Sequence, residues 1–442
     1  MYDVIIVGGG ISGLYMSKLL SNKYPDYRIC VLEQSDYFGG RIKQKTATTY
    51  QGEVSFPSGG ARFNKSHERV IRLLKSYNMI DFRKNKGFSS NIEFIDSKGE
   101  FGRKFDGEHG FLYIEKVLNA ASDKNKTYLQ KHTFQSFAAK VLTKREVEFM
   151  LVASGYSGQL KNMNMYDALH LFTNGIRTDI QYFGGKFHIL IEQMIEDLKK
   201  NSPNVKLILN QHVKTIQNTS VKSNIKTPTT HEHGNTPYIC VETKTQRLVC
   251  KHIVLALPKP ALLKLQCPMI HNIRPILRDS VSCKSLCRTY AIFDKEDVWF
   301  QNLKAKIVTN NQLRYIIPMD VERGLIMISY TDNDYTQYWK NIQTNQNKLK
   351  SAVVSLVKDT FDMDIARPIK VIVCHWECGV AYWNKNVDSD FTSKLLCNPS
   401  QNMYICGENY SLNQSWVEGA LETCETAYKK FVLNQGTISE SR

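Results

Sequence analysis

A glycine-rich turn at residues 8–13, which reads Gly-Gly-Gly-Ile-Ser-Gly, constrains the fold of this chain more than any other segment. The apolar, β-branched run at residues 4–7 before the turn predicts a buried parallel strand. After the turn, the sequence predicts a helix over about residues 11 to 23. A strand, a glycine turn and a helix in this order form the phosphate-binding unit of doubly wound α/β folds.

Each glycine of the pattern G-x-G-x-x-G has a separate expected role. Gly8 would make the tight turn, Gly10 would let the backbone approach a pyrophosphate, and Gly13 would let the helix pack closely on the strand. The phosphates would bind the free N–H groups at the helix N-terminus, around Ile11 and Ser12. A purely structural turn is the alternative, because glycine-rich turns are common.

An acidic residue and a second glycine turn narrow the choice of ligand. Glu33 follows a strand-like segment at residues 28–32 and lies 20 residues after Gly13, the spacing expected for a carboxylate that binds ribose hydroxyls. Gly40 and Arg41 belong to the second turn, whose arginine suits a larger dinucleotide with a pyrophosphate that needs another positive partner. The sequence therefore predicts a dinucleotide site rather than a structural turn.

The length and composition are those of an ordinary globular protein. A chain of 442 residues, with 42% hydrophobic and 23% charged residues, suffices for two or three domains with a sizeable core. No apolar stretch reaches the roughly 18 residues that a membrane-spanning helix needs. No export signal precedes the first strand, so we expect a cytoplasmic protein, with a viral particle or an organelle left open.

The net charge of +16 favours acidic partners, such as nucleic acid or an anionic surface. The basic residues are spread along the chain, however, and form no long basic tail. A generally basic surface is therefore the favoured interpretation, and a nucleic-acid partner and a homodimer stay open.

The eleven cysteines include no C-x-x-C pair. Cys283 and Cys287 are four residues apart, as are Cys374 and Cys378, and both pairs lie in segments of buried character. This placement favours core packing over a metal site. An odd count in a chain without an export signal also predicts reduced thiols.

Two histidines, His231 and His233, lie in a polar, turn-rich stretch. A third ligand at a suitable spacing is missing, so a solvated hairpin tip is the favoured interpretation. We expect no metal site.

Five separated blocks together resemble the flavin monoamine oxidase family, which includes L-amino-acid oxidases, monoamine oxidases and polyamine oxidases. The blocks are residues 1–41, 59–67, 182–186, 253–258 and 407–420. Their order and spacing from one end of the chain to the other are more specific than any single block. The block at residues 59–67 and the segment at 325–331 look most like the L-amino-acid oxidase branch.

The resemblance implies an α/β fold with a Rossmann-type (GR2-like) FAD-binding domain and an α+β substrate domain that has a mixed sheet and a helical lobe. The predicted domains are a discontinuous FAD-binding domain at residues 1–66, 185–262 and 367–442, a helical lobe at 67–184, and the sheet-containing part of the substrate domain at 263–366.

In that family the carboxyl-terminal block returns to the flavin. The resemblance implies that Glu408 lies near the ribityl and phosphate region, that the helix start at Val417 faces the carbonyl edge of the isoalloxazine, and that the backbone of Val213 meets adenine. Ala381 falls where some relatives carry a cysteine bonded to the flavin, so non-covalent FAD is expected. The other implied cofactor-binding residues are Gly8, Gly10, Ile11, Ser12, Gly13, Glu33, Gly40, Arg41, Gly60, Ala61, Arg62, Gly407 and Trp416.

On the substrate side the resemblance implies roles for Arg62, Trp416 and Tyr382. Arg62 would pair with the substrate carboxylate, since a guanidinium gives two parallel charge-assisted bonds; binding of flavin or of a structural acid is the alternative. Trp416 and Tyr382 would be two aromatic walls that steer a neutral amine toward the flavin and exclude water. Tyr315 is a weaker candidate for the same place.

One expected residue is missing. Many relatives place a lysine ten residues before a tryptophan, where it helps oxygen to reoxidise the flavin, and the count back from Trp299 gives Thr289. Arg288 is adjacent, and Lys284 is too far away for that register. A slow oxidase or a dehydrogenase therefore stays open beside an oxidase.

The resemblance implies an FAD-dependent oxidoreductase that oxidises an amine, more specifically an L-amino acid, by hydride transfer to flavin N5. The imine would hydrolyse to a keto acid or aldehyde plus ammonia, and molecular oxygen would give hydrogen peroxide. Two alternatives stay open. One is a catalytically weakened FAD-binding protein with a structural or nucleic-acid-associated role, and the other is a desaturase or carotenoid-type oxidoreductase.

Overall fold

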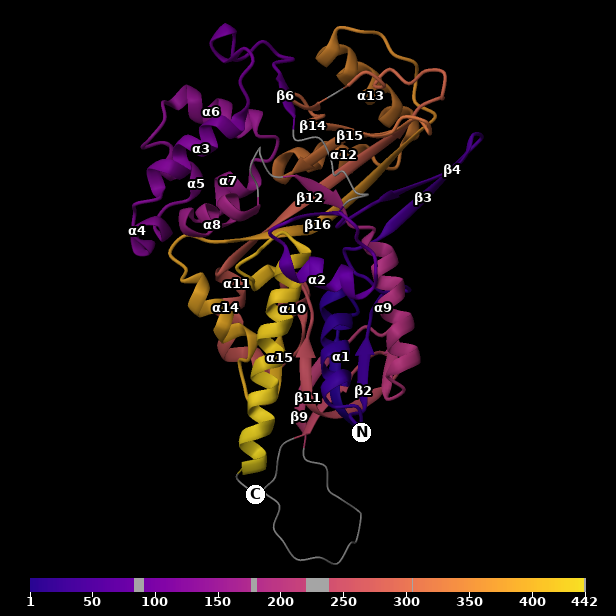
Figure 1. Cartoon of the computed structure of the whole chain (residues 1–442), viewed down its shortest axis with the longest axis vertical. Coiled ribbons are helices and arrows are strands. Elements are labelled where there is room, and N and C mark those ends of the chain that lie inside the picture. Colours follow the sequence, from indigo (N-terminus) through magenta and orange to yellow (C-terminus); the bar gives the residue numbers. More distant parts are fainter. Residues whose placement is uncertain (83–90, 176–180, 220–237, 304, 441–442) are drawn as a thin grey trace, which may run out of the picture.

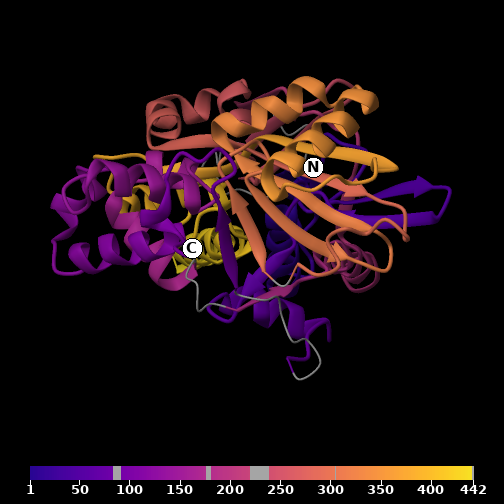
Figure 2. The same ribbon diagram turned by 90° about the horizontal axis from the view of Figure 1, so that it is seen from above.

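The computed structural model describes residues 1–82, 91–175, 181–219, 238–303 and 305–440. It has three parts: a half that holds both ends of the chain, a second half built on another sheet, and a lobe of helices (Figure 1). Figure 2 shows the lobe to one side of the second sheet. His231 and His233 lie outside the described residues.

The first sheet is the predicted dinucleotide-binding sheet. Its strand order is β8 (Val205–Ile208), β2 (Ile29–Leu32), β1 (Tyr2–Val7), β11 (Arg247–Leu255), β10 (Tyr238–Glu242) and β9 (Thr215–Thr219), with β17 (Met403–Ile405) paired to β11. β8, β2, β1, β11 and β17 are parallel, whereas β10 runs antiparallel to both of its neighbours. Helix α1 (Ile11–Lys23) follows β1, which confirms the predicted strand–turn–helix unit.

Helices bury the first sheet on both faces, as a continuous apolar strand requires. Val4 and Ile6 of β1 pack toward one face, and Ile5 and Val7 pack toward the other. The first face is covered by α1, α9 (Phe187–Asn201) and α15 (Val417–Glu440), and the second by α10 (Lys259–Lys264) and α11 (Arg274–Asp279). Helix α14 (Ser389–Cys397) packs against α15 and β17.

The second sheet is mixed, as predicted. Its order is β16 (Lys370–Trp383), β12 (Val281–Ile292), β15 (Leu325–Asp332), β14 (Tyr315–Asp320), β13 (Lys306–Thr309) and β6 (Ile92–Ile95), in which only the β13–β6 pair is parallel. Helices α12 (Thr336–Ile342) and α13 (Gln346–Phe361) supply side chains to the core on one face. The domain boundary at residue 367 stays a prediction, and β16, which follows it, pairs with β12 in this sheet.

The helical lobe consists of α3 (Gly110–Ala121), α4 (Lys126–Gln130), α5 (Phe134–Ala138), α6 (Lys144–Ala153), α7 (Gly158–Asn162) and α8 (Met165–Gly175). Thr133 and Thr143 cap α5 and α6 through reciprocal capping boxes, which fixes where these two helices begin. The lobe has its own core, and this core also takes in Val380 and Tyr382 of β16.

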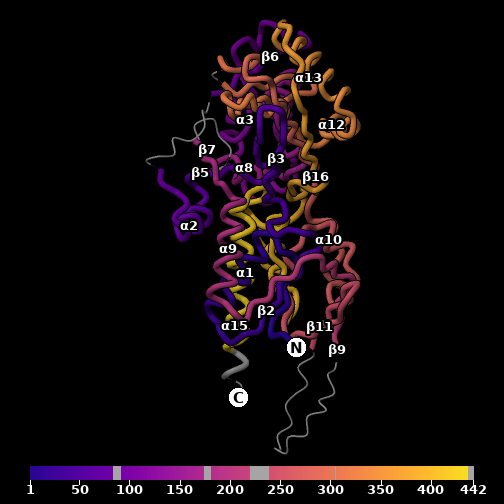
Figure 3. Tube along the Cα trace, turned by 90° about the vertical axis from the view of Figure 1, so that its right-hand side faces the viewer, coloured from indigo at the N-terminus to yellow at the C-terminus, as the bar shows by residue number. Residues whose placement is uncertain are grey.

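Short strands connect the two halves. β5 (Arg62–Asn64) pairs with β7 (Tyr182–Gly184), and β3 (Gln44–Thr49) pairs with β4 (Gly52–Pro57). Helix α2 (Glu68–Ser76) follows β5, and Figure 3 shows α2, β5 and β7 together on one side of the molecule, between the two halves. None of the described helices is long and apolar enough to cross a membrane.

The prediction that all thiols are reduced is wrong for one pair. Cys283 of β12 and Cys378 of β16 form a disulfide, with their Cα atoms 5.0 Å apart. The antiparallel pairing of these strands places Ala381 opposite Cys283 and shifts register just after Lys284, so the disulfide joins the two strands next to this irregularity. Spacing within one strand does not reveal such a partner on the next strand. The nine other cysteines are free and buried, and for Cys287 and Cys374 this confirms the predicted core packing.

Candidate flavin and substrate site

In the first glycine turn, two glycines are in close contact with neighbouring backbone, and the third, Gly10, faces open space. Gly8 has a φ of +106°, and a Cβ built there would overlap the carbonyl of Ala256. A Cβ on Gly13 would overlap the carbonyl oxygen of Gly8, so only glycine lets α1 pack this closely. At Gly10 the nearest atom to a built Cβ is the Cα of Gly40, 4.0 Å away. The turn therefore has open space at Gly10, where a pyrophosphate is expected.

The start of α1 fits an anion. No acidic residue lies in its first turn, and no side chain caps it, so the N–H groups around Ile11 and Ser12 keep their capacity to donate. Gly39 N–H donates to the Gly9 carbonyl at 2.9 Å, which brings the Gly39–Arg41 turn beside this helix start. The donor set therefore fits the phosphates of a dinucleotide.

Glu33 lies at the end of β2 and is buried. Its Oε2 accepts the Gly9 N–H at 2.8 Å and its Oε1 accepts the Ser35 N–H at 2.9 Å, so the carboxylate is held in place and keeps lone pairs for ribose hydroxyls. Gln211 N–H donates to the Glu33 carbonyl at 2.7 Å. That bond brings the segment that carries Val213 next to the end of β2.

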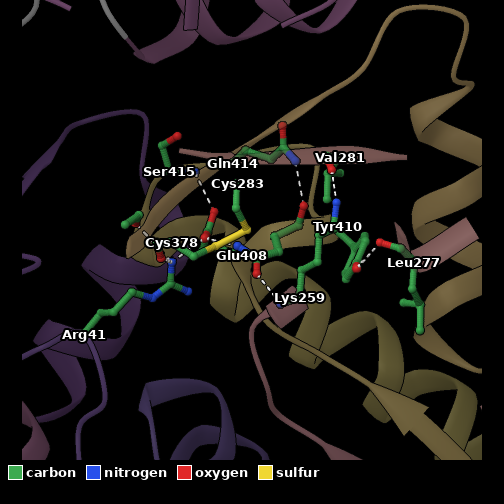
Figure 4. Close-up of a disulfide and its surroundings, with 12 residues drawn as sticks. Arg41, Lys259, Leu277, Val281, Cys283, Cys378, Glu408, Tyr410, Gln414 and Ser415 are labelled. Carbon is green, nitrogen blue, oxygen red and sulfur yellow. Dashed lines mark hydrogen bonds and ion pairs between the residues drawn. A yellow bond between two sulfur atoms is a disulfide. The ribbon is translucent and has the colours of Figure 1, made fainter. Parts of the chain in front are cut away.

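Arg41 and Glu408 form an ion pair, with 2.6 Å between Nη1 and Oε1. The same nitrogen donates to the Gly379 carbonyl at 3.1 Å, and Glu408 Oε2 accepts the Ser415 N–H at 2.9 Å. Figure 4 shows Arg41 reaching Glu408 beside the Cys283–Cys378 disulfide. The pair thus connects the second glycine turn, strand β16 and the carboxyl-terminal block that starts at Gly407.

The backbone around Gly60 lies against the start of α15. Gly60 N–H donates to the Arg41 carbonyl at 3.0 Å, and a Cβ built on Gly60 would lie 3.7 Å from Cγ2 of Val417. The Ala61 carbonyl accepts the Gly185 N–H at 2.9 Å, which connects β5 to the segment after β7. Sequence blocks that are far apart in the chain therefore meet here, as the predicted flavin-ring region requires.

Trp416 stacks on Tyr182. The two rings are nearly parallel, at 9°, with centroids 5.8 Å apart, and His67 lies on Trp416 at 4.7 Å. Trp416 follows Ser415, whose φ of +72° is rare for a residue other than glycine. The indole Nε1 is buried and has no hydrogen-bond partner in the described part of the chain.

Tyr382 and Tyr315 are both buried, but in different surroundings. Tyr382 belongs to the core of the helical lobe, and burial raises the pKa of its hydroxyl well above its usual value. Tyr315 stacks on Tyr156 with centroids 5.2 Å apart. The structure thus brings Tyr182, rather than Tyr382, into a parallel stack with Trp416.

Two cations lie beside Tyr182. The guanidinium carbon of Arg62 is 6.0 Å from the ring centroid, and Nζ of Lys306 is 5.8 Å from it. Arg62 also lies 5.8 Å from the ring of Tyr330. Among residues 1–82, 91–175, 181–219, 238–303 and 305–440, no carboxylate forms an ion pair with either cation.

Arg288 and Thr289 point to opposite faces of β12. Arg288 donates to the carbonyl of Gly59, and Tyr290 donates to that of Pro57 at 2.6 Å, so the face with Arg288 meets the glycine loop. Thr289 is fully buried, with its Oγ1 4.0 Å from the sulfur of Cys287. The cation that reaches the loop from this strand is therefore Arg288.

Several residues of the site carry no readable signal in the sequence. Tyr156 comes from a loop of the lobe and Lys306 from β13 of the second sheet, and no motif surrounds either residue. Tyr330 of β15 lies in the segment at 325–331 that resembles the L-amino-acid oxidase branch, but its place beside Arg62 follows only from the structure. Tyr182 lies inside a block that resembles the family, but its own role follows only from the stack with Trp416. The positions of the other residues beside Arg62 and Tyr182 follow only from the pairing of the strands in the second sheet.

These features define a dinucleotide-binding protein whose second site is aromatic and cationic. A family model described as flavin containing amine oxidoreductase matches residues 11–427. The chain therefore belongs to this family, and its cofactor is FAD.

Individual relatives are distant. An uncharacterized protein of Acanthamoeba polyphaga mimivirus is 22% identical over 100% of this chain and 96% of its own length. Aplysianin-A of Aplysia kurodai is 23% identical, but the match covers 54% of this chain and 50% of that protein. Amine oxidase A of Canis lupus familiaris is 37% identical over 19% of this chain and 15% of its own length.

Solved structures share the fold. A cyclohexylamine oxidase from Brevibacterium oxydans has a TM-score of 0.71 at 16% identity, with 99% of each chain covered. A putrescine oxidase double mutant from a redesign of cofactor binding has a TM-score of 0.74 at 14% identity, and the match covers 98% of this chain and 99% of that one. These likenesses confirm the predicted fold class.

Proposed function

We propose that the protein oxidises an L-α-amino acid to its imine, which water converts to a keto acid and ammonia, with molecular oxygen reduced to hydrogen peroxide. The observation that carries this proposal is Arg62. Its guanidinium lies among the rings of Tyr182 and Tyr330, in the same cluster as Trp416, and has no carboxylate partner in the described chain. A substrate carboxylate would supply that partner through two parallel bonds.

The residues that would hold FAD are those of the glycine turns, Glu33, the Arg41–Glu408 pair and the loop at Gly60 beside Val417. The flavin, when bound, supplies the hydride acceptor for the carbon that carries the amine. We also propose that FAD binds without a covalent bond. Ala381 has no nucleophile, and the sulfur of nearby Cys378 is engaged in the disulfide.

The surroundings of Arg62 and Lys306 favour a neutral substrate amine, which is the form that loses hydride. Buried positive charges disfavour a second cation, so they lower the pKa of an ammonium group placed near them. The same repulsion disfavours amines that stay positively charged elsewhere in the molecule. An amino acid avoids this penalty because its carboxylate offsets the charge of Arg62.

The test compares anaerobic flavin reduction by amino acids and by matched amines that lack the carboxylate. Arg62→Ala should lower kcat/KM for amino acids by about 10- to 100-fold and change that for bare amines much less. The matched control is Arg323→Ala, which removes an equally charged but exposed arginine from the turn between β14 and β15. Equal losses for amino acids and amines would contradict the carboxylate role of Arg62.

A further inference from the structure

The site holds one more cation than a simple amino acid needs. Lys306 of β13 and Arg62 of β5 lie at nearly the same distance from the ring of Tyr182. We propose that the substrate carries a second anionic group, so that it is an L-α-amino acid with an acidic side chain. Its α-carboxylate pairs with Arg62 and its side-chain anion pairs with Lys306. This assignment rests on the proposed function.

Lys306 is buried and its charge is unmatched. The residue is 8% exposed, and no hydrogen bond or ion pair to its Nζ is found within the described ranges. Burial first, and then the charge of Arg62, lower the pKa of Lys306 to about 8, so the ammonium form predominates at neutral pH. An unpaired buried ammonium is costly, and a ligand anion would remove most of that cost.

The aromatic neighbours do not neutralise these cations. Burial raises the pKa of Tyr315 to about 12 and raises that of Tyr182 and Tyr156 above the usual tyrosine value. The hydroxyls therefore stay protonated at physiological pH. They therefore supply no negative charge of their own to offset Arg62 and Lys306.

Arg288, the third nearby cation, has a structural role. Arg288 is engaged with the carbonyl of Gly59, and its guanidinium lies 4.9 Å from the ring of Tyr330. It thus holds the glycine loop in place. Arg62 and Lys306 remain as the two cations of the cluster that no carboxylate neutralises among the described residues.

The phosphates of FAD do not account for Lys306. The groups that fit phosphates belong to the turn at Gly10 and the start of α1 in the first sheet. Lys306 is in the second sheet, on β13 between β14 and β6. Its neighbours are Arg62 and Tyr182, which belong to the proposed substrate site.

The experiment measures binding and reduction separately, on the FAD-loaded protein. Glutarate and butyrate, which carry two and one carboxylates and cannot be oxidised here, are titrated by their perturbation of the flavin absorption spectrum and by the thermal shift they cause. Glutarate should bind at least about tenfold more tightly than butyrate. Lys306→Met should abolish this preference while leaving butyrate binding and flavin content unchanged, and Lys306→Arg should retain most of it.

Reduction is then measured without oxygen for three matched pairs: L-glutamate with L-glutamine, L-aspartate with L-asparagine, and O-phospho-L-serine with L-serine. The acidic member of at least one pair should be preferred by about tenfold or more, and the best pair identifies the anion as carboxylate or phosphate. Equal reduction within every pair, with equal binding of glutarate and butyrate, overturns the acidic-substrate assignment and leaves the proposed function intact. Reduction by bare amines alone overturns the proposed function and this assignment together.

Discussion

The phosphate-binding end of the site consists of backbone, whereas its substrate end consists of side chains from distant segments. At the first end, Gly8, Gly10 and Gly13 lie within six residues, and their spacing is a property of the local turn. At the second end, Arg62 and Lys306 meet on Tyr182 from three separate strands. The cofactor class can therefore be predicted from short segments of this sequence, whereas the substrate class depends on contacts that only the tertiary structure forms.

Gly13→Val should disrupt the phosphate-binding end of the site and has the largest expected effect. A Cβ there would overlap the Gly8 carbonyl, so α1 would have to move away from β1 and the phosphate site would open. We expect complete loss of bound FAD, measured by absorbance of the purified protein. The control is Gly436→Ala in α15, where a Cβ would meet nothing within 4 Å. A yellow Gly13→Val protein with normal FAD content would contradict the role of this glycine.

Removal of the disulfide tests the connection between the two ends. Cys283→Ser with Cys378→Ser frees β16 from β12 next to the Arg41–Glu408 pair (Figure 4). Loss of a native disulfide that closes a long loop lowers the free energy of unfolding by about 2–5 kcal/mol. Chemical denaturation of the FAD-loaded protein measures this change. Cys287→Ser, at a buried free cysteine of the same strand, is the control for polarity in the core. Equal stability of the double variant and the parent would contradict a structural role.

The fold was predictable because its signals are local. The run at residues 4–7, the turn at Gly8 and the acid at Glu33 each depend on neighbours within a few residues, and α1 begins and ends where the pattern predicts. Cross-strand facts were not predictable. The Cys283–Cys378 disulfide joins two different strands, β12 and β16, and no spacing within either strand encodes it.

In the candidate site, too, some residues could be predicted from local sequence and others could not. Arg62 could be singled out because it lies in a glycine block, but its unpaired state depends on residues more than a hundred positions away. Lys306 lies outside any motif, and only the pairing of β13 with β14 and β6 brings its ammonium to Tyr182. Thr289 was expected near the flavin by counting from a tryptophan, yet strand alternation directs its neighbour Arg288 to the glycine loop.

Two buried histidines should make the protein less stable in acid. Burial lowers the pKa of His67, beside Trp416, and of His252, in β11, to about 4. The unfolded chain binds these protons near pH 6.5, so stability falls as the pH drops from 6.5 toward 4. Each histidine should contribute about 1–3 kcal/mol to this loss.

Denaturation at pH 7 and pH 5 measures the loss, and His67→Phe and His252→Phe should each flatten the dependence. If only one variant does so, the acid sensitivity belongs to that histidine alone. An unchanged slope in both variants would contradict the assignment.

The smallest expected effect is a change with pH in how strongly the substrate end prefers a ligand with two carboxylates. The ammonium of Lys306 faces Arg62, which stays charged at any accessible pH, and Tyr182, whose pKa is raised so that it stays neutral. As the pH rises through about 8, Lys306 loses its proton and glutarate loses a partner, while butyrate, which needs only Arg62, does not. The preference for glutarate should therefore shrink by up to about tenfold per pH unit above 8, until the pKa of the complex is passed.

Spectral titrations at pH 7 and pH 9.5 measure this preference, and Lys306→Arg is the matched control. An arginine keeps its charge at pH 9.5, so that variant should retain the preference that the parent loses. A preference that falls equally in both would assign the titration to another group. A preference that does not change in the parent would show that Lys306 does not contact the second anion, and the substrate end would then need only one cation.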